Sequence, residues 1–213
     1  MGIIWGMILA GLTGNYGMGK SSVAAMFRDL GAVTLDCDEI VSNLLTARKV
    51  LRSIRRLFGD SVFSSDRNLD RAALAEIIFS DSRMRLKLEG LLHPMVLRKL
   101  KQELRRLGAG SCIVVVEIPL LFEGDFGSFF DRTITVHTAK KIAVERLKKS
   151  GICRRDALAR LNSQMDIREK KRLADFSINN NGTRRQTASQ ARKIYALLAG
   201  AGGTRVNKGQ HLP

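Results

Sequence analysis

The stretch GNYGMGKSS, residues 14–22, decides the fold of this chain. The residues from Gly14 to Ser21 satisfy the pattern G-x-x-x-x-G-K-[ST], in which a glycine-rich loop turns its backbone N–H groups toward phosphate oxygens. A short apolar run at residues 7–12 precedes the loop, and a segment with helical spacing begins at about Lys20. A buried strand before the loop and a helix after it are the context that this pattern requires. The stretch therefore predicts a nucleotide-phosphate site.

Each part of this loop has a predicted role in binding ATP. Lys20 should reach the β- and γ-phosphates, and the Ser21 hydroxyl should ligate Mg²⁺. The dipole at the N-terminus of the following helix adds to the attraction for phosphate. The alternative is a glycine-rich turn that matches by chance, but the flanking strand and helix favour a phosphate site. The predicted ATP-binding residues of the loop are Gly14, Asn15, Tyr16, Gly17, Met18, Gly19, Lys20, Ser21 and Ser22.

Short apolar runs alternate with helical segments along the rest of the chain. Further strand-like runs lie at residues 32–35, 113–116 and 132–136, and a weaker one lies at residues 176–178. The segments between them include residues 69–79 and 84–107, which have helical spacing. This alternation predicts an α/β fold with a five-stranded parallel sheet.

Two helical segments are longer than simple connections between strands. Residues 39–107 contain no strand-like run and should form a helical insertion. Residues 138–174 are helical in spacing and carry the basic pairs that begin at Lys140, Lys148, Arg154 and Lys170. Such charges usually form a solvated helix face. As a group, they also fit a lid that closes on phosphates.

Carboxylates follow two of the predicted strands. Asp36 and Asp38 follow the second strand, and Glu117 ends the third. In an open parallel sheet, ligands collect at the carboxyl ends of the strands, and alternation in an extended segment sends Asp36 and Asp38 to the same side. Asp38 is the better candidate for the base that accepts a hydroxyl proton, while Asp36 and Glu117 are candidates to support Mg²⁺. The alternative for one aspartate is a helix N-cap.

Composition limits the class of protein. With 213 residues, 45% of them hydrophobic, the chain can bury one substantial core, which predicts one main domain. Its net charge of +16 indicates an anionic partner, which could be nucleic acid, a membrane or a phosphate-rich ligand. Three widely spaced cysteines favour a reducing cytoplasm over a disulfide framework. The apolar start is too short for a membrane span, and residues 207–213 are expected to form a disordered tail.

A series of further motifs resembles the dephospho-coenzyme A kinases. The loop lies within GLTGNYGMGKSSVA at Gly11, and LDCDEI follows at Leu35, NLDRAALAEIIF at Asn68 and LEGLLHPMV at Leu88. IPLLFE at Ile118, ARLNSQM at Ala159 and the asparagine and glycine near residue 180 complete the series. The resemblance implies a three-layer P-loop kinase fold in a single domain of residues 1–206, with an acceptor-binding insertion at about 39–107 and a lid at about 138–174. It implies that ATP, with Mg²⁺, phosphorylates the 3′-hydroxyl of dephospho-coenzyme A to give coenzyme A and ADP.

The same resemblance assigns roles residue by residue. It implies that Asp38 is the base, with Asp36 and Lys20 completing the catalytic group, and that Asn180 and Gly182 border the adenine. Arg71 and His93 fall in the region that binds the acceptor, although a histidine before a proline is by default a helix-boundary residue. The predicted partners are ATP and dephospho-coenzyme A, with no nucleic acid and no membrane. The predicted lid residues are Arg146, Lys149, Arg154 and Arg160.

The chain departs from the family pattern at three places. Cys37 stands in the middle of a motif that is usually DAD, and TARKVLRS lacks a frequent Pro-Gly pair. The lid usually carries an arginine at the position of Ser150. An arginine is the natural neutraliser of charge in the transition state of phosphoryl transfer, so the basic residue that takes this role stays open. The candidates are Lys148, Lys149, Arg154 and Arg160.

Three alternatives to this function stay open from the sequence. One is a P-loop kinase that acts on a nucleoside monophosphate or a metabolite alcohol. A second is an ATPase that binds nucleic acid, which the charge suggests, although scattered aromatic residues give no platform for stacking bases. A third is a regulatory protein that binds ATP without chemistry, which the serine at position 150 suggests.

Overall fold

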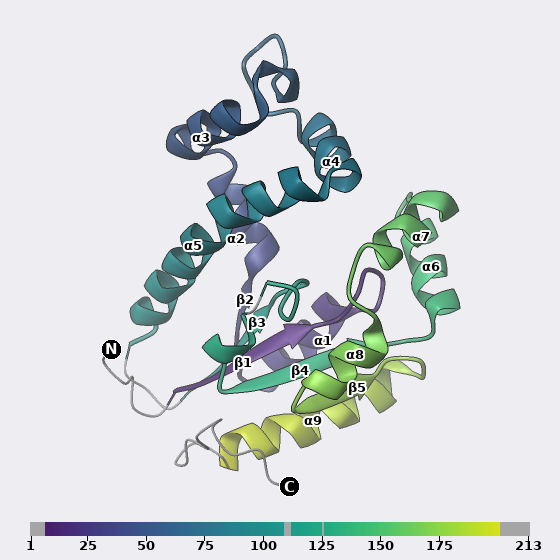
Figure 1. Ribbon diagram of the computed structural model, residues 1–213. Helices are drawn as coiled ribbons and strands as arrows, with labels where there is room; N and C mark the ends of the chain where they lie inside the picture. Colours follow the sequence, from purple (N-terminus) through teal and green to yellow (C-terminus); the bar gives the residue numbers. More distant parts are fainter. Residues whose placement is uncertain (1–6, 109–111, 125, 201–213) are drawn as a thin grey trace, which may run out of the picture. The chain divides into compact units, whose positions relative to one another are not determined.

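A computed structural model describes residues 7–108, 112–124 and 126–200, apart from the side chain of Phe79. Its centre is a five-stranded parallel sheet with the strand order β2-β3-β1-β4-β5 (Figure 1). The five predicted strands are all present, which confirms the α/β fold. Their bounds are β1 Met7–Thr13, β2 Val33–Asp36, β3 Cys112–Glu117, β4 Arg132–His137 and β5 Phe176–Asn179.

The central strands of the sheet are buried, and most of their buried side chains are apolar. β3 is buried from Ile113 to Glu117, and the four residues from Thr133 to Val136 of β4 are buried as well. Runs of this kind are typical of parallel strands that helices cover on both sides. The register places Leu12 of β1 opposite Glu117 of β3, so an acidic side chain ends the strand next to the glycine-rich loop.

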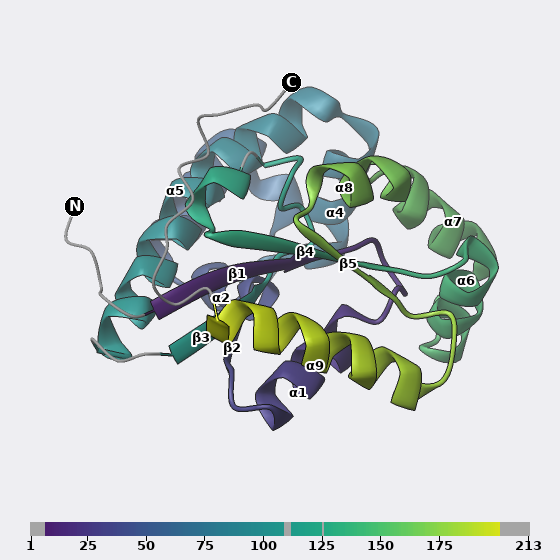
Figure 2. The same ribbon diagram turned by 90° about the horizontal axis from the view of Figure 1, so that it is seen from below.

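Among the described residues, five α-helices belong to the same compact unit as the sheet. Helices α1 and α9 pack beside each other on one face of the sheet, and α8 lies on the other face (Figure 2). The core between the sheet and α1 and α9 includes Phe27, Ile134 and Leu198. The segment expected to form a lid is helical, as predicted. The helices are α1 Lys20–Asp29, α6 Lys140–Lys149, α7 Arg154–Asn162, α8 Ile167–Leu173 and α9 Arg184–Gly200.

The chain divides into two compact units. The unit with the sheet comprises residues 1–35 and 108–213, and the helical unit comprises residues 36–107. The segment expected as an insertion, about 39–107, lies within the helical unit. Val50, Ile54 and Leu92 belong to its separate apolar core. Its helices are α2 Cys37–Leu44, α3 Arg48–Phe58, α4 Arg71–Ser80 and α5 Ser82–Arg106.

Two local expectations about the helical unit are wrong. The helix boundary expected at His93 is absent, because α5 runs without interruption through Pro94. Asp36 and Asp38 do not share an extended segment, because α2 begins at Cys37 and Asp36 is its N-cap. The helix-capping alternative is therefore confirmed for Asp36. Between the two aspartates, the side chain of Cys37 is buried at the start of the helix.

Two expectations concern the ends of the chain. The apolar start continues into β1 from Met7, as predicted, while residues 1–6 lie outside the described part. The tail expected at residues 207–213 also lies outside it. Among the described helices, none has both the length and the apolar character needed to cross a membrane.

Candidate active site

The glycine-rich loop connects β1 to α1 through backbone conformations that favour glycine. Gly17 has a φ of 71° and Gly19 has a φ of 89°, both in the left-handed region. A Cβ atom on Gly17 would lie 2.5 Å from the carbonyl oxygen of Ala143, and a Cβ atom on Gly19 would collide with Nδ2 of Asn180. Space and conformation therefore both require glycine, so the loop backbone lies directly against its neighbours.

Lys20 and Ser21 begin α1 at the point where the loop ends. Lys20 is 9% exposed, and its Nζ lies 6.0 Å from the centre of the Tyr16 ring. The Ser21 hydroxyl donates a hydrogen bond to Oε1 of Glu117, over 3.1 Å. The structure thus brings together two of the predicted Mg²⁺ ligands, Ser21 and Glu117. Loop, lysine, hydroxyl and carboxylate form one candidate phosphate and metal site.

Asn180 follows β5 and holds the loop from its far side. Its Nδ2 donates to the carbonyl oxygen of Met18 over 2.9 Å, and its Oδ1 accepts from the hydroxyl of Thr187 over 3.0 Å. Asn180 is buried, whereas Gly182 is exposed in the turn that follows. Both ends of the Asn180 amide thus contact the protein, which gives this residue a role in shaping the loop.

Two of the four predicted lid residues lie beside the loop. The Arg146 guanidinium donates to the carbonyl oxygens of Asn180, over 3.1 Å, and Met18, over 3.4 Å. The guanidinium carbon of Arg160 lies 5.8 Å from the centre of the Tyr16 ring. These arginines therefore contribute positive charge next to the predicted phosphate site.

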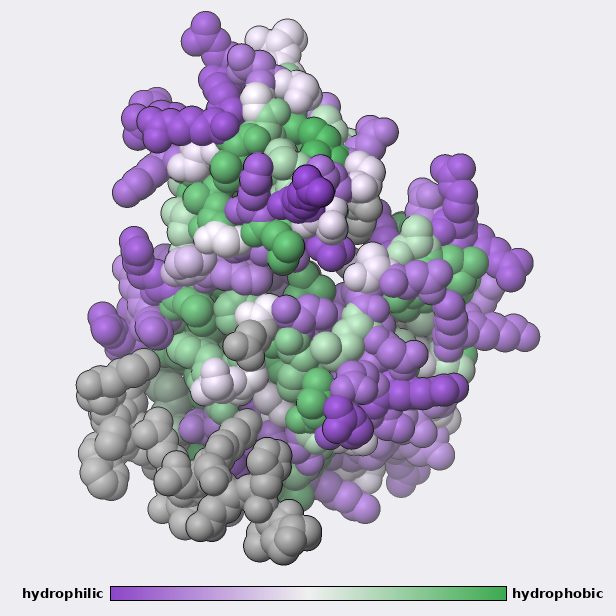
Figure 3. All heavy atoms as spheres, in the orientation of Figure 1, coloured by the Kyte–Doolittle hydropathy of each residue, from purple (hydrophilic) through white to green (hydrophobic). Residues whose placement is uncertain are grey.

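The other two predicted lid residues are exposed. Lys149 ends α6 and Arg154 begins α7, and hydrophilic side chains stand out from the surface over these helices (Figure 3). Ser150, where the family usually has arginine, is the C-cap of α6, and its hydroxyl donates to the carbonyl oxygen of Arg146 over 3.2 Å. Ser150 therefore ends α6 and offers no positive charge at the position where the family usually has arginine.

Several polar residues that sequence reasoning missed surround the loop. The Tyr16 N–H donates to Oε1 of Gln164 over 2.9 Å, and Nδ2 of Asn15 donates to the carbonyl oxygen of Met165 over 3.0 Å. Lys170 was interpreted as part of a solvated basic face, yet its side chain is fully buried. The helical spacing does not single it out, because Ile167 lies three residues before Lys170 and four residues before the exposed Lys171.

The carboxylates of LDCDEI lie in the helical unit. Oδ1 of Asp36 accepts a hydrogen bond from the N–H of Asp38 over 2.8 Å, which caps α2. Both residues are exposed. The capping interaction fixes where α2 begins and therefore where Asp38 stands in its first turn. Asp36 consequently has a structural function that does not depend on any ligand.

The two predicted acceptor-binding residues belong to the same unit. Arg71 begins α4, and its guanidinium donates to the hydroxyl of Ser42, over 3.1 Å, and to the Ser42 carbonyl oxygen, over 3.2 Å. His93 lies within α5 and is half-buried. Burial lowers the pKa of His93 below its usual value of 6.5, while the nearby charge of Glu89 partly opposes this shift.

A magnesium ion bound to ATP fits the residues of the loop. Within the described part of the chain, no cluster of three or more His, Cys, Asp or Glu side chains could hold a metal ion alone. Mg²⁺ in kinases needs no such cage, because the phosphates and water supply most of its ligands and the protein adds one or two oxygens. Ser21 and Glu117, which are hydrogen-bonded to each other, offer an oxygen set of this kind.

Comparisons with known proteins identify the family of this chain. The family model for dephospho-CoA kinase matches residues 8–186. The dephospho-CoA kinase of Geobacillus kaustophilus is 37% identical over 191 residues, which cover 88% of this chain and 94% of the relative. The crystal structure of TT1252 from Thermus thermophilus has a TM-score of 0.80 and 36% identity, and covers 89% of this chain and 96% of that chain. A dephospho-CoA kinase from Campylobacter jejuni has a TM-score of 0.64 and 25% identity, with 92% and 98% covered. This chain belongs to the dephospho-CoA kinase family.

Proposed function

We propose that this protein transfers the γ-phosphoryl group of ATP to the 3′-hydroxyl of dephospho-coenzyme A, giving coenzyme A and ADP. The observation that carries the proposal is a phosphate-binding loop whose Ser21 hydroxyl contacts Glu117, in a chain that the dephospho-CoA kinase model matches over residues 8–186. The loop accounts for the donor nucleotide, and family membership accounts for the acceptor. The protein therefore acts as a small-molecule phosphotransferase, and we place it in the cytoplasm.

The loop and Lys20 bind the phosphates of ATP. The positive φ values of Gly17 and Gly19 turn the backbone between two buried elements, and the N-terminus of α1 adds its dipole. Lys20 is mostly buried, so its ammonium faces few water molecules and interacts strongly with phosphate oxygens. In phosphoryl transfer, catalysis depends mainly on such positioning and charge stabilisation.

Ser21 and Glu117 would hold a magnesium ion that arrives with ATP. The bound ion would neutralise charge on the β- and γ-phosphate oxygens. The Ser21 hydroxyl would offer an oxygen to the ion, and the Glu117 carboxylate, which accepts a hydrogen bond from this hydroxyl, would orient it. Asp36, the third residue predicted for the metal, uses one carboxylate oxygen to cap α2.

Asp38 accepts the proton of the acceptor hydroxyl in this proposal. A carboxylate at the start of a short helix has a fixed place, because the Asp36 cap holds the first turn. Arg71 and His93 bind the acceptor. Arg71 is already oriented by its two hydrogen bonds to Ser42, so fewer conformations are lost when it meets a phosphate of the acceptor.

The basic helices provide the remaining charge and exclude water. Arg146 and Arg160 lie next to the loop, whereas Lys149 and Arg154 are exposed. We assign neutralisation of the transition-state charge to Arg146 and Arg160, because a cation acts over short distances. Closure of this segment would keep water from the γ-phosphate and prevent wasteful hydrolysis of ATP.

A panel of acceptors tests this function against two of the alternatives, a kinase with another acceptor and a regulatory protein that only binds ATP. Purified protein with Mg·ATP is incubated with dephospho-coenzyme A, with nucleoside monophosphates and with metabolite alcohols such as shikimate. The proposal predicts rapid ADP formation with dephospho-coenzyme A only. Preference for a monophosphate or an alcohol would contradict it. ATP binding without turnover on any acceptor would favour a regulatory protein.

A further inference from the structure

A fully buried lysine lies close to the phosphate-binding loop. The side chain of Lys170, on α8, is 0% exposed. Its Nζ forms an ion pair with Oε1 of Glu123 over 2.8 Å and donates to the carbonyl oxygen of Pro119 over 2.8 Å. Burying an ammonium group costs much free energy unless it is paired and hydrogen-bonded. The two contacts meet this requirement and tie α8 to the segment that follows β3.

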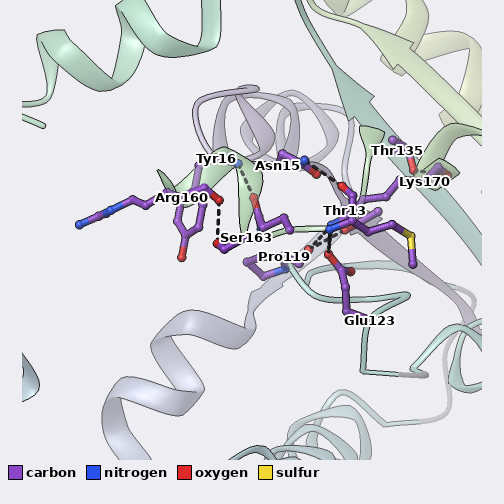
Figure 4. Close-up of polar contacts among 11 residues, drawn as sticks. Thr13, Asn15, Tyr16, Pro119, Glu123, Thr135, Arg160, Ser163 and Lys170 are labelled. Atoms are coloured by element: carbon purple, nitrogen blue, oxygen red, sulfur yellow. Dashed lines mark hydrogen bonds and ion pairs between the residues drawn. The ribbon is translucent and has the colours of Figure 1, made fainter. Parts of the chain in front are cut away.

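Each of the two partners of Lys170 is connected by further hydrogen bonds to a residue at the start of the phosphate-binding loop. The carbonyl oxygen of Pro119 also accepts from the Thr13 hydroxyl over 3.1 Å. Oε1 of Glu123 also accepts from the N–H of Met165 over 3.0 Å, and the Met165 carbonyl oxygen accepts from Asn15. Figure 4 shows the contacts among Thr13, Asn15, Pro119, Glu123 and Lys170.

These contacts form a closed circuit around Gly14. Thr13 is the last residue of β1 and Asn15 is the second residue of the loop, so the circuit holds the backbone on both sides of this glycine. The Lys170 carbonyl oxygen accepts a hydrogen bond from the hydroxyl of Thr135 over 3.0 Å, which anchors α8 to β4. Thr13 and Thr135 are fully buried, and Asn15 is 4% exposed.

The charges around Lys170 agree with a role near the phosphates. Burial lowers the pKa of Lys170 below its usual value of 10.5, Glu123 opposes this shift, and the nearby charge of Lys20 adds to it. Glu123 therefore balances a charge that would otherwise stand unpaired behind the loop.

We propose that Lys170 is a positioning residue for ATP: by holding Pro119 and Glu123 together, it fixes Thr13 and Asn15 and so the shape of the phosphate-binding loop. The inference rests on the proposed use of this loop for ATP, but not on the identity of the acceptor. A loop that is already ordered binds phosphate more tightly than one that must be ordered on binding. Without Lys170, part of the binding free energy of ATP would be spent on ordering.

The test measures ATP binding by calorimetry in the absence of acceptor, which separates this inference from the proposed reaction. Lys170→Met should weaken ATP binding by about tenfold, as expected when the binding-competent loop becomes a minor state. The apparent KM for dephospho-coenzyme A should change less than about twofold, since no acceptor contact is removed. Lys171→Met is the matched control, because Lys171 is exposed on the same helix, and it should bind ATP as the original protein does.

Coupling between the members of the circuit gives a sharper test. Glu123→Gln should also weaken ATP binding, and the double variant Lys170→Met/Glu123→Gln should bind ATP about as weakly as the weaker single variant, because both break one circuit. If the double variant instead lost as much binding free energy for ATP as the two single variants together, the proposal would be overturned. So would single variants that are less stable to heat and yet bind ATP normally, since this would be a purely structural role.

A third variant covers the case in which Lys170→Met does not fold. Thr13→Val removes the hydroxyl contact with Pro119, keeps the side-chain shape and changes no charge. Circular dichroism establishes that this variant and Glu123→Gln are folded before ATP binding is measured. Weaker ATP binding in both supports the circuit. Unchanged affinity in both overturns it.

Discussion

The two units of this protein hold their candidate functional residues in different ways. In the unit with the sheet, Lys20, Asn180 and Lys170 are buried, and a network of polar contacts holds the loop. In the helical unit, an apolar core packs the helices, while Asp38 and Arg71 stand exposed on them.

This difference has a physical reason. Phosphates must be bound in a partly dry site to gain strong electrostatic stabilisation, so the groups around them are buried and each buried polar group needs a partner. An acceptor that enters and leaves is met by groups on a surface, and an apolar core beneath is enough to position them. The contrast predicts that changes in the unit with the sheet affect ATP, and changes in the helical unit affect the acceptor.

The largest effect is expected at Lys20. Lys20→Met removes the ammonium that we propose contacts the phosphates, and should lower kcat by about 10²–10³-fold, the usual loss for one electrostatic group in a transition state. Lys141→Met is the control, because Lys141 is an exposed lysine of α6. Steady-state kinetics with saturating dephospho-coenzyme A measure the effect. A normal kcat in the Lys20→Met variant would contradict the proposed role of the loop in binding phosphate.

A smaller effect, confined to the acceptor, is expected at Arg71. Arg71→Ala removes a guanidinium that Ser42 orients, and the KM for dephospho-coenzyme A should rise by about tenfold, the loss of one charged hydrogen bond. The KM for ATP should stay the same. Arg83→Ala, at an exposed arginine of the same unit, should change neither value. An equal rise in both KM values would break the proposed division between the units.

The smallest effect concerns acid stability. Burial lowers the pKa of both His93, in the helical unit, and His137, in the other unit. Between these lowered values and 6.5, the unfolded chain binds more protons than the folded protein, so stability rises with pH and is lost as pH falls.

Replacing either histidine should therefore weaken this pH dependence. Urea unfolding of His93→Gln and His137→Gln at about pH 5, 6 and 7 should give a flatter dependence of the free energy of unfolding than in the original protein. In the double variant, the free energy of unfolding should depend on pH less than in either single variant. A steeper dependence would show that the shifts have the opposite sign.

The sequence predicts the donor side of the site well because local pattern and chemistry coincide there. G-x-x-x-x-G-K-[ST] implies both a backbone shape and a ligand, and the strand-like runs of β1, β3 and β4 are mostly apolar because these strands are buried in the sheet. The contact between Ser21 and Glu117 follows from the strand order, since β3 lies next to β1.

The remaining features depend on contacts between distant residues. His93 and Pro94 suggested a helix boundary, but a helix that packs along its length can retain a proline at the cost of one hydrogen bond. Asp36 and Asp38 suggested alternation, but the N-cap starts a helix between them. Lys170 resembled a solvated lysine because its partners, Pro119 and Glu123, are about fifty residues away, at separations of 51 and 47.

The division of function between the units is tested most directly by measuring Asp38→Asn in two ways. The exchange keeps the shape of the side chain and removes its ability to accept a proton, so turnover of dephospho-coenzyme A should fall by about 10²–10⁴-fold, the usual contribution of a general base. ATP binding, measured by calorimetry without acceptor, should be unchanged, because the ATP-binding loop belongs to the other unit. Undiminished turnover would contradict the role of Asp38, and a parallel loss of ATP binding would contradict the division itself.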